Sequence, residues 1–180
     1  MSGWRSHEEQ QRIWDDTMAD KGEDFTRRFV ALPGCSEHQT GLAIDLGRAA
    51  RRIDFIRPNF PNHGVCGAFR RLAAGYGFIE RYRRDKERLT GISAEPWHFR
   101  YVGAPHAQIM LENNLCLEEY AAFLRDGGAR VASVGDGRSA RVFYVPCQGE
   151  STEIELPEGE AMISGDNDAG FIVTLWHSAA

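Results

Sequence analysis

The chain has 180 residues, of which 42% are hydrophobic, and a formal net charge of −5. This length is sufficient for one hydrophobic core and a small additional module. The negative charge balance argues against a nucleic-acid-binding protein, because such proteins normally carry a basic excess. The sequence contains no run of 18 apolar residues and no recognisable signal peptide, so it predicts no transmembrane helix.

The cysteines and the basic residues predict surface and core features rather than a site. The four cysteines, Cys35, Cys66, Cys116 and Cys147, are widely spaced and form no CxxC pair. This spacing predicts buried free thiols, and neither a zinc ribbon nor a dense disulfide framework. Basic residues gather at 48–57 and at 81–88, and we interpret both clusters as solvated faces rather than anion sites.

The N-terminal end predicts a helix over residues 7–20. Ser6 and Glu9 form a capping-box pattern, and apolar residues follow at helical spacing until Gly22 ends the pattern. The next segment, 25–32, precedes a Pro-Gly break and predicts a loop or a short helix.

The middle of the chain alternates short strands and helices. The apolar run 42–46 is interrupted by Asp45, a charge that a half-buried strand leaves uncompensated unless a metal neutralises it. The following segments predict a helix over 65–74, a strand over 78–82, a turn over the arginine-rich residues 83–88 and an antiparallel partner strand over 97–102.

The C-terminal part predicts two helices followed by strands. The helices cover 106–112 and 117–124, with Asn113-Asn114 between them, and a hairpin joins 130–134 to 141–145 around Gly135-Asp136-Gly137. Further strands are predicted over 153–156, 161–164 and 171–176. The whole pattern predicts an α+β fold: a small antiparallel sheet with flanking helices in residues 1–127, and a small antiparallel β module in residues 128–180.

Two short segments contain the residue types of a divalent metal site. The first holds His38 and Asp45 with Gly41 between them, and the second holds His98. Two histidines and one carboxylate form a three-ligand set for Zn²⁺ that leaves a fourth position open for catalysis. We therefore interpret these three residues as metal ligands. We assign the remaining histidines to the surface or to core positions where their hydrogen bonds are satisfied; they are His7, His63, His106 and His177.

Glu95 lies three residues before His98 and is the candidate acid/base. Pro96 restricts Glu95 to an extended backbone, so the two residues are not expected to share a helix face. A carboxylate beside such a metal can take the proton of an attacking water and deliver it to a leaving amine.

These segments resemble the zinc D,D-carboxypeptidases and D,D-dipeptidases of the VanY and VanXY type. The family pattern SxHxxGxAxD followed by ExWH stands here as Ser36-x-His38-x-x-Gly41-x-Ala43-x-Asp45 and Glu95-Pro96-Trp97-His98. A third element, SGxRS with a glutamine five residues after the arginine, appears as Ser2-Gly3-Trp4-Arg5-Ser6 and Gln10. The resemblance runs from Ser2 to about Leu124.

The resemblance implies roles for the site residues. Zinc would be held by His38, Asp45 and His98, with Glu95 as the catalytic base and Arg5 against the scissile carbonyl, where it stabilises the oxyanion. Ser36, Gln10 and Tyr82 would form the pocket for the terminal residue of the peptide and its carboxylate, and Trp97 would pack against and orient His98. Taken without the resemblance, each residue has a simpler interpretation. Arg5 would form a surface salt bridge, Ser36 would cap a loop, Gln10 would lie on a solvated helix face, and Tyr82 would be an ordinary aromatic residue of a strand.

The implied reaction is hydrolysis of the peptide bond before a C-terminal D-amino acid, in peptidoglycan stem peptides or in D-Ala-D-Ala. The alternatives are an L,D-carboxypeptidase or wall endopeptidase of the same chemistry, and a non-catalytic zinc-stabilised module that binds wall peptides. The resemblance implies the bacterial cell envelope, whereas a native start at Met1 implies the cytoplasm. Because the chain opens directly in motif-like sequence, we expect further residues upstream of Met1.

Overall fold

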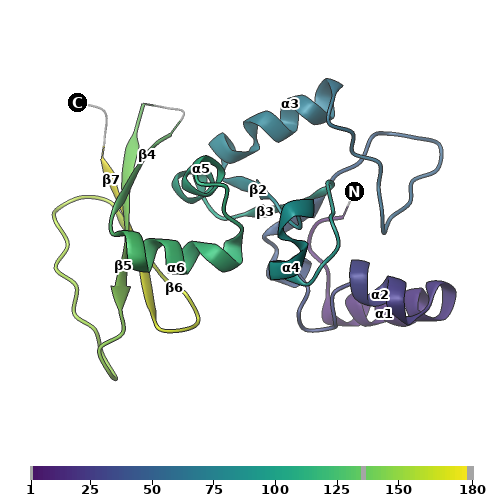
Figure 1. Ribbon diagram of the computed structural model, residues 1–180, viewed down its shortest axis with the longest axis horizontal. Coiled ribbons are helices and arrows are strands. Elements are labelled where there is room, and N and C mark those ends of the chain that lie inside the picture. Colours follow the sequence, from purple (N-terminus) through teal and green to yellow (C-terminus); the bar gives the residue numbers. More distant parts are fainter. Residues whose placement is uncertain (1, 135–136, 178–180) are drawn as a thin grey trace. The chain divides into compact units, whose positions relative to one another are not determined.

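The structure is a computed structural model that describes residues 2–134 and 137–177 (Figure 1). Its helices are α1 (His7–Lys21), α2 (Glu23–Phe29), α3 (Gly64–Leu72), α4 (Glu87–Thr90), α5 (Ala104–Glu112) and α6 (Leu117–Gly127), with 3₁₀ turns η1 (Glu37–Thr40), η2 (Ala73–Tyr76) and η3 (Arg84–Lys86). Its strands are β1 (Ala43–Asp45), β2 (Phe78–Glu80), β3 (His98–Tyr101), β4 (Arg130–Ser133), β5 (Ser139–Pro146), β6 (Ala161–Gly165) and β7 (Gly170–His177).

The chain forms two compact units. The first comprises Met1–Ala73 with Phe78–Val102, and the second comprises Ala74–Gly77 with Gly103–Ala180. The α+β class with two small antiparallel sheets is confirmed. The functional division that we predict after residue 127 stays a prediction. Among the described residues, no helix is both long and apolar enough to cross a membrane.

The first unit is built on a three-stranded antiparallel sheet with the order β1-β3-β2. The predicted pairing of β2 with β3 is confirmed. In the central strand, Phe99 is fully buried and packs against the rings of Phe60 and Phe69 at centroid distances of 5.5 and 4.9 Å. Because successive side chains of a strand point to opposite faces, His98 projects away from this core. One face of the sheet is therefore packed, and the other is available for the site.

The second unit is a four-stranded antiparallel sheet with the order β4-β5-β7-β6, contacted by α5 and α6. The predicted β4–β5 hairpin is confirmed, and residues 135 and 136 of its turn lie outside the described part of the chain. His106 of α5 joins three elements, because its ring nitrogens lie 2.9 Å from the Tyr120 hydroxyl of α6 and 3.1 Å from Thr174 Oγ1 of β7. His106 is thus a satisfied histidine of this unit, as predicted.

Several details differ from the sequence-based predictions. Residues 83–88 form η3 and α4 rather than a simple turn. Residues 153–156 form no strand; their side chains alternate in burial, but their backbone has no ladder partner among the described residues. Cys66 and Cys116 are buried free thiols as predicted, whereas Cys35 and Cys147 are exposed. The basic cluster at 81–88 is not uniformly solvated, because Arg81 is only 8% exposed.

Candidate metal centre

His38 enters the site from a tight turn directly before β1. It lies in η1, which is followed by Gly41 as the C-cap residue with a left-handed backbone and φ of 73°. Glycine adopts this conformation without steric penalty, so the chain can reverse at once into β1. Four residues after Gly41, the strand delivers Asp45, and His38 Nε2 lies 3.0 Å from Asp45 Oδ2. The spacing of the first motif is therefore the length of one turn plus one short strand.

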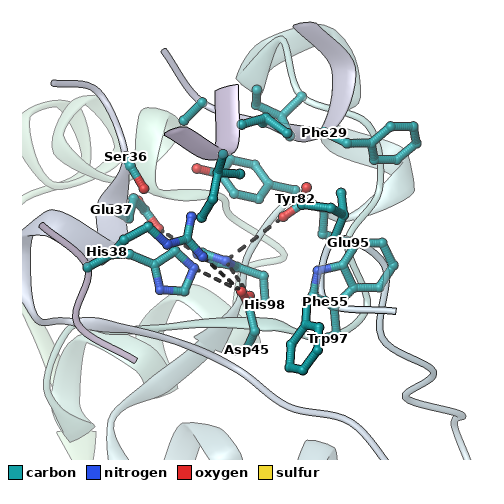
Figure 2. A pocket seen from close by; sticks show the side chains of 16 residues that line it. Phe29, Ser36, Glu37, His38, Asp45, Phe55, Tyr82, Glu95, Trp97 and His98 are labelled. Carbon is teal, nitrogen blue, oxygen red and sulfur yellow. Dashed lines mark hydrogen bonds and ion pairs between the residues drawn. The ribbon is translucent and has the colours of Figure 1, made fainter. Parts of the chain in front are cut away.

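His98 reaches the same point from the neighbouring strand. Asp45 of β1 and His98 of β3 are direct partners in the antiparallel register, so their side chains lie on the same face of the sheet. His98 Nδ1 is 3.0 Å from Asp45 Oδ1. Figure 2 shows the three side chains pointing toward one another. One ligand atom from each of the three residues lies within 4.8 Å of the others, and all three residues are buried.

In both His38 and His98, the second ring nitrogen lies within hydrogen-bond distance of an acceptor outside this group. His38 Nδ1 lies 2.7 Å from the carbonyl oxygen of Gly3, and His98 Nε2 lies 3.2 Å from Glu37 Oε2. Outer acceptors of this kind fix the tautomer and ring orientation of metal-binding histidines. The inner atoms, two ring nitrogens and a carboxylate, are all electron-pair donors, so the residues present fit a divalent ion such as Zn²⁺.

Glu37 was not predicted as a site residue. It sits next to His38 in η1, and its Oε1 accepts hydrogen bonds from Arg81 Nε at 2.8 Å and lies 3.1 Å from Arg100 Nη1. The only sequence feature that pointed to Glu37 is its position between Ser36 and His38 of the first motif. Its partners come from β3 and from the residue after β2, and the sequence does not show that pairing.

The electrostatics of the group reflect burial and close opposite charges. Burial alone would raise the pKa of Asp45, but the hydrogen bonds with His38 and His98 hold it well below the usual range. Burial would lower the pKa of His98, yet its contacts with Asp45 and Glu37 raise it to about 9. Without a cation, the two carboxylates thus favour a protonated His98, and a bound metal ion would take the place of that proton.

Glu95 lies beside this group, but its pKa is shifted in the opposite direction from that of Asp45. It begins a turn in which His98 N–H donates to the Glu95 carbonyl oxygen at 3.1 Å, and its own N–H donates to the Tyr82 carbonyl oxygen at 2.8 Å. The turn confirms that Glu95 and His98 share no helix. Glu95 Oε2 is 3.9 Å from His98 Nδ1, on the pocket wall. Burial raises the pKa of Glu95 to about 8, with nearby Asp45 and Glu37 acting in the same direction. A buried carboxyl group beside a metal-binding group is a candidate for proton transfer.

Arg5 reaches the site because the N-terminal segment is tied to β1 and η1. Ser2 and Asp45 exchange two backbone hydrogen bonds, at 3.3 and 2.8 Å, and Arg5 N–H donates to the His38 carbonyl oxygen at 3.2 Å. The guanidinium lines the pocket and lies 3.8 Å from Asp45 Oδ2. Burial lowers the pKa of Arg5, although the carboxylates of Asp45, Glu9 and Glu95 oppose this effect.

Gln10 lies behind Arg5 and does not line the pocket. Its side chain is fully buried; Oε1 accepts from Arg5 Nη1 at 2.7 Å, and Nε2 donates to the Ala31 carbonyl oxygen at 2.7 Å. The alternative of a solvated helix face is therefore wrong for this residue.

Ser36 and Tyr82 both line the pocket with the metal group. Tyr82 has a left-handed backbone with φ of 63°, which is uncommon outside glycine and is found at functional sites. Its ring lies 5.2 Å from the His98 ring, centroid to centroid. Trp97 is buried in the core cluster, as expected for a packing residue. The pocket wall also includes Glu37 and Trp97, and its remaining residues are apolar: Ile13, Phe29, Val30, Ala31, Phe55, Ile56 and Ile92. Figure 2 labels Phe29, Phe55 and Trp97 among them.

Comparison with known proteins identifies the family. Residues 1–104 match the family model described as VanY, D-alanyl-D-alanine carboxypeptidase. The chain belongs to the VanY family. The match includes every residue of the metal group together with Glu95 and Arg5.

VanY-family relatives extend this result. The chain is 47% identical, over 125 residues, to the bifunctional D-Ala-D-Ala dipeptidase and carboxypeptidase VanXYC of Enterococcus gallinarum, covering 69% of this chain and 66% of that protein. It therefore spans slightly less than two thirds of that relative. The crystal structure of the D,D-dipeptidase VanXYg with a D-Ala-D-Ala phosphinate analogue matches 98% of this chain and 72% of its own, with 53% identity and a TM-score of 0.91. A mutant of the D,D-pentapeptidase VanY from a VanB-type resistance cassette, in complex with Zn(II), matches 66% of this chain and 68% of its own, with 39% identity and a TM-score of 0.52.

Proposed function

We propose that this chain is a zinc-dependent D,D-peptidase that hydrolyses the peptide bond before a C-terminal D-amino acid, in D-Ala-D-Ala or in a peptidoglycan stem peptide. His38, Asp45 and His98 hold the ion. Support comes from the three convergent donor atoms and their outer acceptors. The zinc complex of a VanY relative also supports this choice of metal.

When bound, zinc lowers the pKa of an adjacent water molecule and polarises the scissile carbonyl group. The observation that carries the catalytic assignment is the Glu95 carboxyl group, which lies on the pocket wall within 3.9 Å of His98 Nδ1. Glu95 accepts the proton of the attacking water and passes it to the nitrogen of the leaving amino acid. A protein that only bound peptides would have no use for a buried carboxyl group at this point.

Arg5 supplies a fixed positive charge on the other part of the same wall. Its guanidinium is held from behind by Gln10 and Ser2, at 2.7 and 3.0 Å. A donor held in place before the reaction stabilises negative charge on the carbonyl oxygen without costly reorganisation. We assign Arg5 this oxyanion role, and we assign Gln10 the role of holding Arg5 rather than contacting the substrate.

Ser36 and Tyr82 complete the polar part of the substrate pocket. Both line the pocket with Arg5 and with apolar side chains such as Phe29 and Ile92. A small apolar side chain next to a carboxylate is the chemistry of a terminal D-alanine, so we propose that Ser36 and Tyr82 contact that residue.

Among peptidases of this chemistry, D,D-specificity is favoured by the extent of similarity. The D,D-dipeptidase structure matches nearly the whole chain, including the second unit, at 53% identity. The dipeptide and the longer stem peptide both remain substrates of the proposal, because the relative from Enterococcus gallinarum is named for both activities.

The experiment is an assay of free D-alanine. Zinc-loaded protein is incubated with D-Ala-D-Ala, with a muramyl pentapeptide ending in D-Ala-D-Ala, and with a muramyl tetrapeptide, whose terminal bond is an L,D-bond. We expect release from one or both D,D-substrates and none from the tetrapeptide. Release from the tetrapeptide alone would replace the D,D-assignment by an L,D-carboxypeptidase. No release from any substrate by protein with confirmed zinc content would refute the peptidase proposal.

A further inference from the structure

Glu37 occupies a position between His98 and two arginines. Its Oε2 lies 3.2 Å from His98 Nε2, and its Oε1 lies 2.8 Å from Arg81 Nε and 3.1 Å from Arg100 Nη1. Only about 10% of the Glu37 side chain is exposed, and the Arg81 side chain is 9% exposed. A carboxylate held from three directions in this way has one fixed orientation.

His98 needs such a partner because its two nitrogens have different tasks. Nδ1 faces Asp45 at 3.0 Å and belongs to the inner group with His38, whereas Nε2 points outward to Glu37. A neutral imidazole carries one proton, which must reside on one nitrogen and leave the lone pair of the other free. If the proton were on Nδ1, His98 could not bind the ion through this inner nitrogen.

We propose that Glu37 is the positioning residue that keeps the His98 proton on Nε2, so that Nδ1 presents its lone pair to the metal ion. This inference rests on the proposed function, because it assumes that His98 is a metal ligand. Glu37 lines the same pocket, but it lies at Nε2 of His98, away from the inner nitrogen Nδ1, and we assign it a role that acts through His98.

The two arginines strengthen the hydrogen bond between Glu37 and His98. Arg81 and Arg100 are cations that hold the carboxylate in place, and a charged acceptor forms a stronger hydrogen bond with an N–H donor than a neutral acceptor does. The other ligand histidine lacks this support, since His38 Nδ1 faces the neutral carbonyl oxygen of Gly3. The two histidine ligands are therefore unequal, and His98 is the one whose donor strength depends on an ionised side chain.

The test measures zinc affinity without any substrate, by competition with a chromophoric chelator. Partners of metal-binding histidines typically contribute about 10- to 100-fold to metal affinity. Glu37→Gln keeps an oxygen acceptor but removes the charge, so we expect about 10-fold weaker zinc binding. Glu37→Leu removes the acceptor, and we expect about 100-fold weaker binding. Glu37→Gln is the nearly isosteric variant, so it also serves if Glu37→Leu does not fold.

The matched control is Asp166→Asn. Asp166 is also a carboxylate with a 2% exposed side chain and an arginine partner, Arg125, but it belongs to the second unit. We expect this variant to lose stability and to keep the zinc affinity of the unchanged protein. If Glu37→Gln and Glu37→Leu both bind zinc within about threefold of the unchanged protein, the inference is wrong.

A second measurement separates positioning from simple structural support. In zinc-loaded protein labelled with ¹⁵N, we expect the His98 Nε2 resonance of a protonated nitrogen and the Nδ1 resonance of a metal-bound one. A proton on Nδ1 would overturn the proposal. Unfolding of the metal-free and zinc-loaded forms completes the test: an equal loss of stability in both forms of Glu37→Gln would also overturn it. If the unchanged protein binds no zinc, the proposed function itself fails. If the unchanged protein binds zinc and the Glu37 variants bind it equally tightly, only this inference fails.

Discussion

Each compact unit contains a well-shielded carboxylate whose pKa is lowered by its hydrogen bonds, against the opposite effect of burial. Asp166 of the second unit accepts from the Tyr144 hydroxyl and from three backbone N–H groups of the following turn. These partners are permanent donors, so the carboxylate is satisfied by the protein itself. Asp45 of the first unit instead faces ring nitrogens of His38 and His98, which are donors only while they are protonated.

Asp45 and Asp166 differ in the feature that distinguishes a functional carboxylate from a structural one. Burial and a lowered pKa are common to both residues, so neither property marks a site alone. What distinguishes Asp45 is the convergence of groups that all can donate electron pairs, next to a pocket. The predictions below test whether the first unit behaves as such a site and the second unit as a structural element.

The largest effect is expected at Glu95. Replacement by alanine should lower kcat by about 10²- to 10⁴-fold, because it removes the group that transfers the proton. Zinc binding should persist, since the three ligands are unchanged. The measurement is D-alanine release together with the zinc content of the same sample. Unchanged turnover in this variant would remove Glu95 from the mechanism.

Arg5→Ala should produce the next largest loss. Removal of a preorganised oxyanion donor typically costs about 10²- to 10³-fold in kcat. Arg5→Lys should restore little of it, because the ammonium group cannot reproduce the guanidinium contacts with both Gln10 and Ser2. Steady-state kinetics distinguish the roles: an effect confined to KM would indicate ground-state binding and contradict the oxyanion assignment.

A smaller kinetic effect is expected for Gln10→Leu. The variant leaves the Arg5 guanidinium without its 2.7 Å contact, and the resulting displacement should cost up to about 100-fold in kcat. The matched control is Gln11→Leu on the same helix, whose exposed side chain contacts only Asp15 among the described hydrogen bonds. We expect no loss in that variant. If Gln10 contacted the substrate directly, the loss would instead appear mainly in KM.

The smallest effect concerns stability in the second unit. Burial lowers the pKa of His106 to about 4, below the usual value of about 6.5 for histidine. The folded chain thus keeps His106 neutral where the unfolded chain protonates it. Its contribution to stability is present above pH 6.5 and is lost as the pH falls toward 4.

Between pH 7 and pH 5, this residue should account for a loss of about 2 kcal/mol in unfolding free energy. The measurement compares denaturant unfolding of the unchanged protein and His106→Gln at both pH values. The variant should lack this part of the pH dependence, while its D-alanine release at pH 7 stays that of the unchanged protein. An identical pH dependence in the two proteins would contradict the assignment.

The sequence predicted the inner part of the site well because local patterns encode it. Gly41 permits the turn that links His38 to Asp45, and Pro96 excludes a helix between Glu95 and His98. The pairing of β1 with β3, which places Asp45 opposite His98, was not predicted, although the shared ligand chemistry of the two motifs did predict that these residues meet. In these cases the residues that shape the backbone lie next to those that carry the chemistry.

The outer part of the site could not be predicted, because it depends on contacts between distant segments. Glu37 meets Arg81 and Arg100 only when η1, β2 and β3 are assembled. In the second unit, residues 153–156 alternate apolar and acidic side chains as a strand does, and we predicted a strand there. Alternating apolar and acidic residues indicate which side chains face the protein. A strand also requires a neighbouring strand to hydrogen-bond with, and a single sequence does not reveal that neighbour.

The most direct test is the zinc content of Asp45→Asn compared with Asp166→Asn, measured after both variants and the unchanged protein have been equilibrated with one equivalent of zinc and desalted. We expect one zinc ion per chain in the unchanged protein and in Asp166→Asn, and a large loss in Asp45→Asn. Equal zinc content in the two variants, or none in the unchanged protein, would contradict the claim that His38, Asp45 and His98 form the metal site.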